Sequence, residues 1–387
     1  MLDYSQQDLE ALGADITTRE IYQQPQVWQQ AFANYQKKKE QIEQFLVAIS
    51  SQARPVRVIF TGAGTSAYVG DTLLPHLREV SQDQPWDFYS VATTDILARP
   101  LTYLKREITT ILVSFARSGN SPESVACVDL AKQLVDNLYQ ITITCAEQGQ
   151  LALQARGDER NLLLLQPAAS NDAGFAMTSS FSSMLLTALL VFDPADLSVK
   201  TDKFTGLLKL TTAVFDGLDQ LASLLQKDFK RVIYLGAGPF FGLAHEAQLK
   251  VLELTAGQIA TMYESPLGFR HGPKSLVDSD SLVIVFGSSN PYTKLYDLDL
   301  VRELAGDGIA RGLVLATQTK EDLEQVDQLV LGGQPTDDIY LAFPYLVYAQ
   351  LLALLTAIKL GNRPDTPSPT GTVNRVVQGV LVHPFEP

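Results

Sequence analysis

Short apolar segments alternate with longer polar or amphipathic segments along most of the chain. In the first half, the apolar segments are residues 57–61, 86–91, 110–115, 141–145 and 161–167. Apolar, partly β-branched strands separated by helical stretches are typical of a parallel sheet that is covered by helices on both faces. The pattern therefore predicts a doubly wound α/β lobe.

This pattern occurs twice. The sequence VIFTGAG at residues 58–64 recurs as VIYLGAG at residues 232–238, a displacement of 174 residues. The segments that follow keep nearly the same displacement, which chance similarity would not maintain. They pair residues 108–116 with 281–288, 141–145 with 313–317, and 161–167 with 338–344. We therefore expect two tandem doubly wound parallel-sheet lobes, with a strand in each paired segment.

The remaining long segments predict helices. The opening fifty residues form an N-terminal helical segment, and residues 207–229 form a helical bridge between the lobes. Two further helices, at residues 181–192 and 343–360, are long and apolar. We expect three parts, which are the helical segment at 1–50, the first lobe at 51–205, and the bridge, second lobe and tail at 206–387.

The segment at residues 341–360 is apolar enough to resemble a membrane span. Pro344 near its start, Gln350 in its middle and the lack of flanking charge asymmetry favour a helix buried on all sides. A subunit interface would supply extra burial, and we expect a homodimer or larger homo-oligomer. The polar, acidic N-terminus does not resemble a signal peptide, so we expect a cytoplasmic protein with no membrane partner.

The composition narrows the possible partners. The formal net charge is −13 over 387 residues, whereas nucleic-acid binding requires a basic face, so we expect no nucleic-acid partner. Cys127 and Cys145 lie in apolar segments, and the cysteines and histidines lack metal-ligand spacing. We therefore expect no disulfide framework, no metal and no cofactor. Backbone N–H groups at a helix N-terminus can still bind a small anion.

A glycine turn follows the first strand of the first lobe. Residues 62–67 (GAGTSA) would fit the first turn of a dinucleotide-binding fold, but this motif alone is weak evidence. That fold also needs an acidic residue at the end of the next strand, and residues 86–91 (WDFYSV) end without one. A nicotinamide-dependent oxidoreductase is therefore disfavoured. Glycines that merely permit a tight turn are the alternative interpretation.

A serine loop follows the strand predicted at residues 110–115. Residues 116–124 (ARSGNSPES) place hydroxyl groups at Ser118 and Ser121, before a predicted helix. Hydroxyls, a glycine and a helix N-terminus together form an anion cradle. Ser121 before a proline is also a good N-cap, so helix capping is the alternative. Phosphate binding is favoured because Thr65 and Ser66 follow the neighbouring strand, at the same edge of the sheet.

Together, residues 64–66 (GTS) and 117–121 (RSGNS) resemble the phosphosugar-binding loops of SIS (sugar isomerase) domains. The resemblance covers both lobes and extends to the isomerase half of glucosamine-6-phosphate synthase. Residues 170–181 (SNDAGFAMTSSF) and 263–274 (YESPLGFRHGPK) are similar to the AgaS group, tagatose-6-phosphate ketose/aldose isomerases also described as galactosamine-6-phosphate deaminases. The resemblance implies two flavodoxin-like SIS lobes.

The resemblance also implies that polar residues of the first lobe bind a hexose 6-phosphate. The phosphate-binding and loop-lining residues would be Thr65, Ser66, Arg117, Ser118, Asn120 and Ser121. The residues in contact with the sugar hydroxyls would be Thr178 and Ser179. The second lobe has Gly-Pro-Phe at residues 238–240, where the first has Gly-Thr-Ser. We therefore expect the second lobe to support the site rather than to bind a second phosphate.

Aldose–ketose interconversion moves a proton between C1 and C2 and needs a carboxylate base that reaches both carbons. Lys250 and Glu253 share one face of a predicted helix, so the lysine could keep the glutamate ionised. A surface ion pair is the alternative, although the neighbouring residues are mostly apolar. The resemblance matches Glu253 to the proton-transfer glutamate of the synthase. Glu264, expected in a loop, and then His271, which could instead hold that loop by hydrogen bonds, rank after it.

These features predict a metal-free enzyme that acts on an amino- or keto-hexose 6-phosphate. With a 2-amino sugar the proton transfer yields an imine, and its hydrolysis gives a ketose and ammonia. Galactosamine 6-phosphate would thus give tagatose 6-phosphate. Simple phosphosugar isomerisation and a non-catalytic sugar-phosphate sensor are the alternatives. A sensor that reads DNA would carry a basic helix-turn-helix, and the first fifty residues show no such charge.

Overall fold

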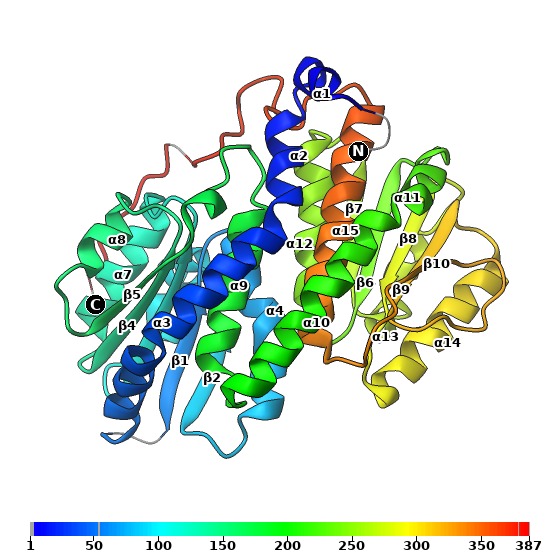
Figure 1. The fold of residues 1–387 in the computed structure, drawn as a ribbon. Helices are drawn as coiled ribbons and strands as arrows, with labels where there is room; N and C mark the ends of the chain where they lie inside the picture. The colour runs from blue at the N-terminus through cyan, green and yellow to red at the C-terminus, as the bar shows by residue number, and fades with distance from the viewer. Residues whose placement is uncertain (1–3, 53–54, 378, 387) are drawn as a thin grey trace. The chain divides into compact units, whose positions relative to one another are not determined.

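The computed structural model describes residues 4–52, 55–377 and 379–386. These residues form two parallel sheets of five strands each (Figure 1). The strands of the first sheet are β1 (Val56–Thr61), β2 (Trp86–Ser90), β3 (Thr110–Ala116), β4 (Leu138–Thr144) and β5 (Asn161–Leu165). The strands of the second sheet are β6 (Arg231–Gly236), β7 (Ala260–Glu264), β8 (Ser281–Phe286), β9 (Gly312–Thr317) and β10 (Asp327–Val330). The predicted tandem α/β fold is confirmed.

Both sheets have the same topology. The first has the strand order β2-β1-β3-β4-β5, and the second, read from its other edge, has the order β7-β6-β8-β9-β10. This is the flavodoxin-like order, in which the strand order reverses between the first and third strands of each sheet. Ligands of such sheets bind outside the carboxyl ends of the strands, near that reversal.

The chain divides into two compact units, each built around one sheet. The β1–β5 unit comprises residues 23–173, 177–194 and 371–387. The β6–β10 unit comprises residues 1–22, 174–176 and 195–370. The predicted N-terminal segment contributes to both, because α1 (Gln6–Leu12) and α2 (Asp15–Tyr22) belong to the β6–β10 unit and α3 (Gln24–Ser50) to the other. The domain boundaries after residues 50 and 205 stay predictions.

Helices cover both faces of the first sheet. On one face α4 (Thr65–Val80) and α9 (Ser179–Phe192) pack together, with α3 against α9. On the other lie α5 (Thr93–Ala98), α7 (Pro122–Leu134) and α8 (Gln150–Ala155), with α6 (Pro100–Tyr103) beside α5. Neighbouring strand residues point to opposite faces of the sheet. The ring of Phe60 packs on that of Phe192 in α9, with the ring centroids 5.3 Å apart. Ile59 lies on the other face, in a buried cluster with Ile96 of α5 and Val128 of α7, here called the α5–α7 cluster.

The second sheet is covered in the same way. On one face α12 (Pro239–Leu254) packs on β6 and β7, and α15 (Asp338–Lys359) packs on α12. Two bridge helices, α10 (Leu197–Asp216) and α11 (Leu218–Leu225), contact α15. On the other face lie α13 (Pro266–Phe269) and α14 (Pro291–Asp307), which share a buried cluster with β6, β8 and β9.

Helix α15 is the apolar segment that resembles a membrane span. Among the described residues, one helix is long and apolar enough to cross a membrane by length and composition alone, and that helix is α15. All of its most apolar window is buried inside the protein. The prediction of a helix buried on all sides is therefore confirmed, and α10 and α12 of the same chain supply the burial without a subunit interface.

One predicted strand is wrong. Residues 338–344, paired in the sequence with 161–167, form the first turns of α15, and the last strand of the second sheet is β10. A segment that is buried on every side is apolar at all positions, so its pattern has neither the period of a strand nor that of a helix. The short edge strand β10 carries exposed polar residues and gives little signal.

The C-terminal tail belongs to the β1–β5 unit, although positions 378 and 387 of the predicted tail lie outside the described residues. Phe385 packs against the α5–α7 cluster, and its carbonyl accepts a hydrogen bond from Gln133 at 3.3 Å. The described end of the tail is therefore docked on the β1–β5 unit.

Candidate functional site

The glycine turns after β1 and β6 share one backbone conformation. Gly64 has φ 55° and ψ −132° before α4, and Gly238 has φ 57° and ψ −129° before α12. Residues with a Cβ rarely adopt this region. A Cβ at Gly62 would lie 2.6 Å from the backbone of Ser66. The geometry of the strand-to-helix turn therefore requires these glycines, in both halves of the repeat.

The serine loop connects β3 to α7. Ser121 occupies the N-cap position of α7, but its hydroxyl makes no capping bond and instead donates to Ser124 Oγ at 2.6 Å. Helix capping therefore does not account for Ser121. Ser118 Oγ accepts the N–H of Asn120 at 3.3 Å, so the backbone turns around that oxygen. Within the described ranges, the hydroxyl hydrogen of Ser118 has no recorded acceptor.

The other two loop residues are held by the protein. Asn120 Oδ1 accepts the N–H of Gln150 at the start of α8, at 2.9 Å. Arg117 is buried, and its Nη2 donates to the carbonyl oxygen of Arg375 in the tail. These contacts fix the shape of the loop, and the buried guanidinium supplies a positive charge within it.

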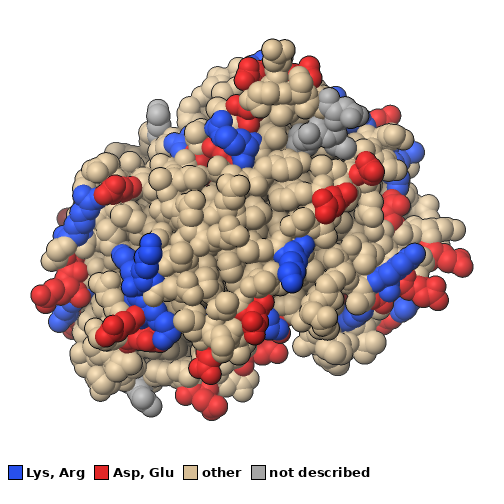
Figure 2. Space-filling model, viewed as in Figure 1, with Lys and Arg blue, Asp and Glu red and all other residues tan. Residues whose placement is uncertain are grey.

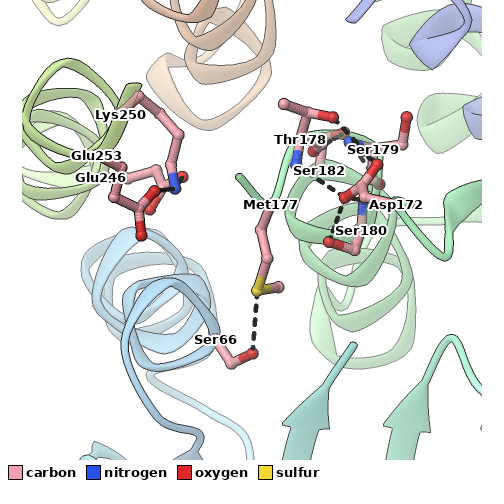
Figure 3. Close-up of polar contacts among 10 residues, drawn as sticks. All are labelled: Ser66, Asp172, Met177, Thr178, Ser179, Ser180, Ser182, Glu246, Lys250 and Glu253. Carbon is pink, nitrogen blue, oxygen red and sulfur yellow. Dashed lines mark hydrogen bonds and ion pairs between the residues drawn. The ribbon is translucent and has the colours of Figure 1, made fainter. Parts of the chain in front are cut away.

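Thr65 and Ser66 form the first turn of α4 and are buried. Ser66 Oγ lies 3.8 Å from the sulfur of Met177 (Figure 3), and a thioether is only a weak acceptor. Strands β1 and β3 are neighbours in the sheet, so the turn and the serine loop lie at the same carboxyl edge. The structure thus brings these predicted phosphate-binding residues to one edge of the β1–β5 sheet.

Thr178 and Ser179 lie at the N-terminus of α9, where Asp172 binds the backbone (Figure 3). The fully buried Asp172 carboxylate accepts the N–H groups of Thr178, Ser179 and Ser180 at 2.8, 3.0 and 2.9 Å. It also accepts the Thr178 hydroxyl at 3.0 Å and the Ser180 hydroxyl at 2.6 Å. An anion at a helix N-terminus is stabilising, and these bonds compete with any sugar contact of Thr178. Sequence spacing gives no sign of Asp172, which lies six residues before the N-cap.

Lys250 is buried in α12 between two glutamates (Figure 3). Its Nζ lies 2.6 Å from Glu253 Oε2 and 3.4 Å from Glu246 Oε1. Burial lowers the pKa of Lys250, but the charges of Glu246 and Glu253 outweigh it, so the pKa is raised overall and the lysine stays protonated. The Glu246 side chain is fully buried, whereas 25% of the Glu253 side chain is exposed. The group is therefore not a surface ion pair, and Glu253 is its accessible carboxylate.

Glu264 is the last residue of β7 and not, as predicted, a loop residue. It pairs with Leu235 of β6, and the partial exposure of β7 explains why its sequence did not predict a strand. Its Oε1 accepts the N–H of Ser265 at 2.7 Å. His271 is exposed, and its ring makes no recorded hydrogen bond within the described part of the chain. The structural role considered for this histidine is therefore not observed.

Charged side chains of both signs are mixed on the face shown in Figure 2. Lys and Arg lie among Asp and Glu there and do not gather into one basic area. That face presents no concentrated positive field to a nucleic-acid backbone.

These features define a tandem α/β protein that has a serine loop at the edge of one sheet and a buried Lys–Glu cluster beside the other. The SIS domain family model matches residues 51–193 and 225–360. The chain is 42% identical over 377 residues to D-galactosamine-6-phosphate deaminase AgaS of Escherichia coli, and the match covers 96% of each protein. It is 41% identical over 382 residues to the protein of the same name from Shewanella sp. (strain ANA-3), covering 98% of this chain and 95% of that protein.

A solved structure agrees with these relatives. The crystal structure of tagatose-6-phosphate ketose/aldose isomerase from Escherichia coli matches with a TM-score of 0.88 and 39% identity, covering 96% of this chain and 97% of that one. The chain therefore belongs to the SIS domain family and, within it, to the group of the AgaS proteins. The resemblance inferred from the glycine turn and the serine loop is confirmed.

Proposed function

We propose that this chain converts galactosamine 6-phosphate to tagatose 6-phosphate and ammonia, as an enzyme of the phosphosugar isomerase/deaminase class. The observation that carries the proposal is 42% identity, over 96% of both proteins, to a galactosamine-6-phosphate deaminase. The serine loop and the Lys250–Glu253 pair support it, because they supply an anion cradle and an accessible carboxylate.

The phosphate is bound by the serine loop. The hydroxyls of Ser66 and Ser118 donate to the phosphate oxygens, and that of Ser121 does so once it turns away from Ser124. The α7 N-terminus and Arg117 add positive potential. Thr65 and Asn120 shape the two loops. Both predicted sugar contacts already have partners in the protein: the Thr178 hydroxyl donates to Asp172, and Ser179 Oγ accepts from Gln23.

Glu253 transfers the proton. It removes the C2 proton of the open-chain amino sugar, giving an enolamine, and returns a proton to C1, which leaves an imine at C2. Water adds to this imine and ammonia leaves, so the ketose phosphate is formed. Lys250 donates to Glu253 Oε2 at 2.6 Å and so holds the carboxylate in place for the first step. His271 assists ring opening, because its ring is exposed while the Glu264 carboxylate is bonded to Ser265.

Simple aldose–ketose isomerisation is the second candidate. It is favoured by the similarity to a structure named tagatose-6-phosphate ketose/aldose isomerase. The two reactions share the C1/C2 proton transfer and differ in whether C2 carries an amine. Ammonia and ketose, measured separately for amino and neutral hexose 6-phosphates, distinguish them.

Glu253→Gln tests the catalytic assignment. The variant keeps the side-chain shape but cannot take a proton, so kcat for ammonia release is expected to fall by about 100-fold or more. Glu43→Gln is the matched control, because it removes an exposed carboxylate paired with Lys39 in α3. A Glu253→Gln enzyme with wild-type kcat would refute the base assignment and leave the substrate assignment standing.

The assembly and the location of the enzyme belong to the same proposal. We propose a cytoplasmic homodimer or larger homo-oligomer, with active sites completed at the subunit interface. Size-exclusion chromatography with light scattering, run beside an activity assay on the same fractions, tests this. A fully active monomer would contradict it.

A further inference from the structure

The second sheet carries its own version of the serine loop, between β8 and α14. Ser288 Oγ accepts the N–H of Asn290 at 3.1 Å. The same turn is made in the first sheet by Ser118 and Asn120, and both residues lie 170 positions earlier. Each loop leads into a helix that begins with a proline. The two loops are therefore equivalent parts of the repeat.

A carboxylate of the β6–β10 unit occupies this second loop. Asp338, the first residue of α15, accepts the Ser288 hydroxyl at 2.5 Å. It also accepts the N–H of Ser289 at 2.6 Å and its hydroxyl at 2.7 Å. Tyr345 of the same helix donates to the carbonyl of Gly287 at 3.2 Å. The donors around Asp338 are the kind that bind a phosphate oxygen, namely hydroxyls and a backbone N–H near a helix N-terminus.

The equivalent helix of the first unit begins differently. Helix α9 follows the last strand of its sheet, as α15 does, but it begins with Ser179 instead of an aspartate. Across the described parts of the chain, no carboxylate is recorded as an acceptor for Ser118 or Ser121. The first loop thus has the donors without the internal anion.

Asp297 places a second acidic group next to the second loop. It is 1% exposed, and its Oδ2 accepts the N–H of Ser288 at 2.9 Å. Its Oδ1 has no hydrogen-bond partner among the described residues. The matching position of α7, six residues after its first proline, holds the apolar Val128. A phosphate entering this loop would therefore meet two acidic groups that the first loop lacks.

We propose that Asp338 is a built-in ligand of the second serine loop, whose carboxylate takes the place of a phosphate and excludes phosphorylated ligands there. Asp338 is thus a specificity-determining residue that limits each chain to the first loop. The comparison with that loop rests on the proposed function, while the contacts of Asp338 stand independently of it.

Equilibrium dialysis with radiolabelled inorganic phosphate tests this by counting sites per chain. Asp338→Ser, which copies Ser179 and keeps a hydroxyl, and Asp338→Ala are each combined with Asp297→Asn. We expect these double variants to bind one more phosphate per chain than the wild type. Asp337→Ala is the matched control, because Asp337 lies at the same helix start and pairs with Lys203 at 3.3 Å instead of the loop. It should keep the wild-type number of sites.

The added phosphate is expected to bind at the second loop, so its binding can be tested separately from phosphate binding at the first loop. Adding Ser118→Ala should leave the added site intact. If the wild type binds no phosphate while the Asp338 variants gain a site, the first-loop assignment fails and this inference holds. If the variants are folded by circular dichroism and keep the wild-type number of sites, the inference is overturned.

Discussion

Lys250 is the buried cation at the centre of the ion cluster in α12. Its fully buried ammonium group is stabilised by Glu246 and Glu253, which lie within 3.4 Å of it. The same contact that neutralises the lysine also holds the carboxylate of Glu253, whose side chain is 25% exposed. One ion cluster therefore holds both a buried charge of the fold and the carboxylate proposed as the base.

Lys250→Met is expected to destabilise the protein by about 3–5 kcal/mol, because it leaves the buried Glu246 and the partly exposed Glu253 without their cation. Urea denaturation measures this change in the free energy of unfolding. Adding Glu246→Gln should recover part of the loss. Lys39→Met breaks an exposed ion pair and should cost less than about 1 kcal/mol. Equal effects of the two lysine substitutions would show that the buried cluster has no special role.

Asp297 predicts a pH dependence of stability. Burial, reinforced by the charge of Asp338, raises its pKa from 3.8 to about 7, against the lowering effect of the Ser288 N–H. The folded protein thus holds this proton more tightly than the unfolded chain does. The contribution of this proton to the stability of the folded protein is fully present below about pH 4 and is lost as the pH rises through about 7.

Asp297→Asn should therefore stabilise the protein more, relative to the wild type, at about pH 8.5 than at about pH 5. Urea denaturation at both values checks this. Asp299→Asn, an exposed position in the same helix, should show no such difference. If the difference in free energy of unfolding between Asp297→Asn and the wild type is the same at both pH values, the raised pKa of Asp297 is contradicted.

Whether a contact between two residues could be predicted from the sequence depends on how far apart they lie along the chain. Ser66 and Ser118 could be placed at one sheet edge because each follows a strand directly, and neighbouring parallel strands end together. Asp338 could not be placed, since it reaches Ser288 across 50 residues and its sequence shows only an acid before an apolar helix. Contacts of that kind arise from tertiary packing, which local spacing does not encode.

At the scale of elements, the strand-to-helix turns are the most constrained features. The continuous apolar strands β1, β3, β4, β6 and β8 were predictable because they are buried on both faces. The partly exposed strands β7 and β10 were not, because exposed faces carry polar residues and break the apolar run. The repeated glycine turn does not depend on side-chain burial, because the backbone conformation at Gly64 and Gly238 by itself favours glycine.

Gly238→Ala should destabilise the protein by about 1–3 kcal/mol, because its backbone lies in a region that a Cβ disfavours. The space around it is open, so strain and not a steric clash causes the loss. Gly206→Ala is the matched control: it also has open space, but it lies inside α10 and should stabilise by about 0.5–1 kcal/mol. Thermal denaturation compares the two, and a stabilising Gly238→Ala would contradict the required turn.

At the scale of the whole molecule, one topology is used twice with unequal results. Both sheets have the same strand order, the same glycine turn and a serine-containing loop before a helix that begins with a proline. The first loop keeps hydroxyl donors for a ligand, whereas Asp338 fills the second. The second unit contributes the Lys250–Glu253 pair instead. The two halves thus share one scaffold and differ in a few side chains.

The most direct test of the central claim is ammonia release from galactosamine 6-phosphate and from galactosamine, measured side by side with the ketose formed. We expect ammonia and ketose phosphate in equal amounts from the phosphorylated sugar, and little product from galactosamine, because the proposed serine-loop site needs the phosphate. No ammonia from galactosamine 6-phosphate, or equal rates from both sugars, would contradict it.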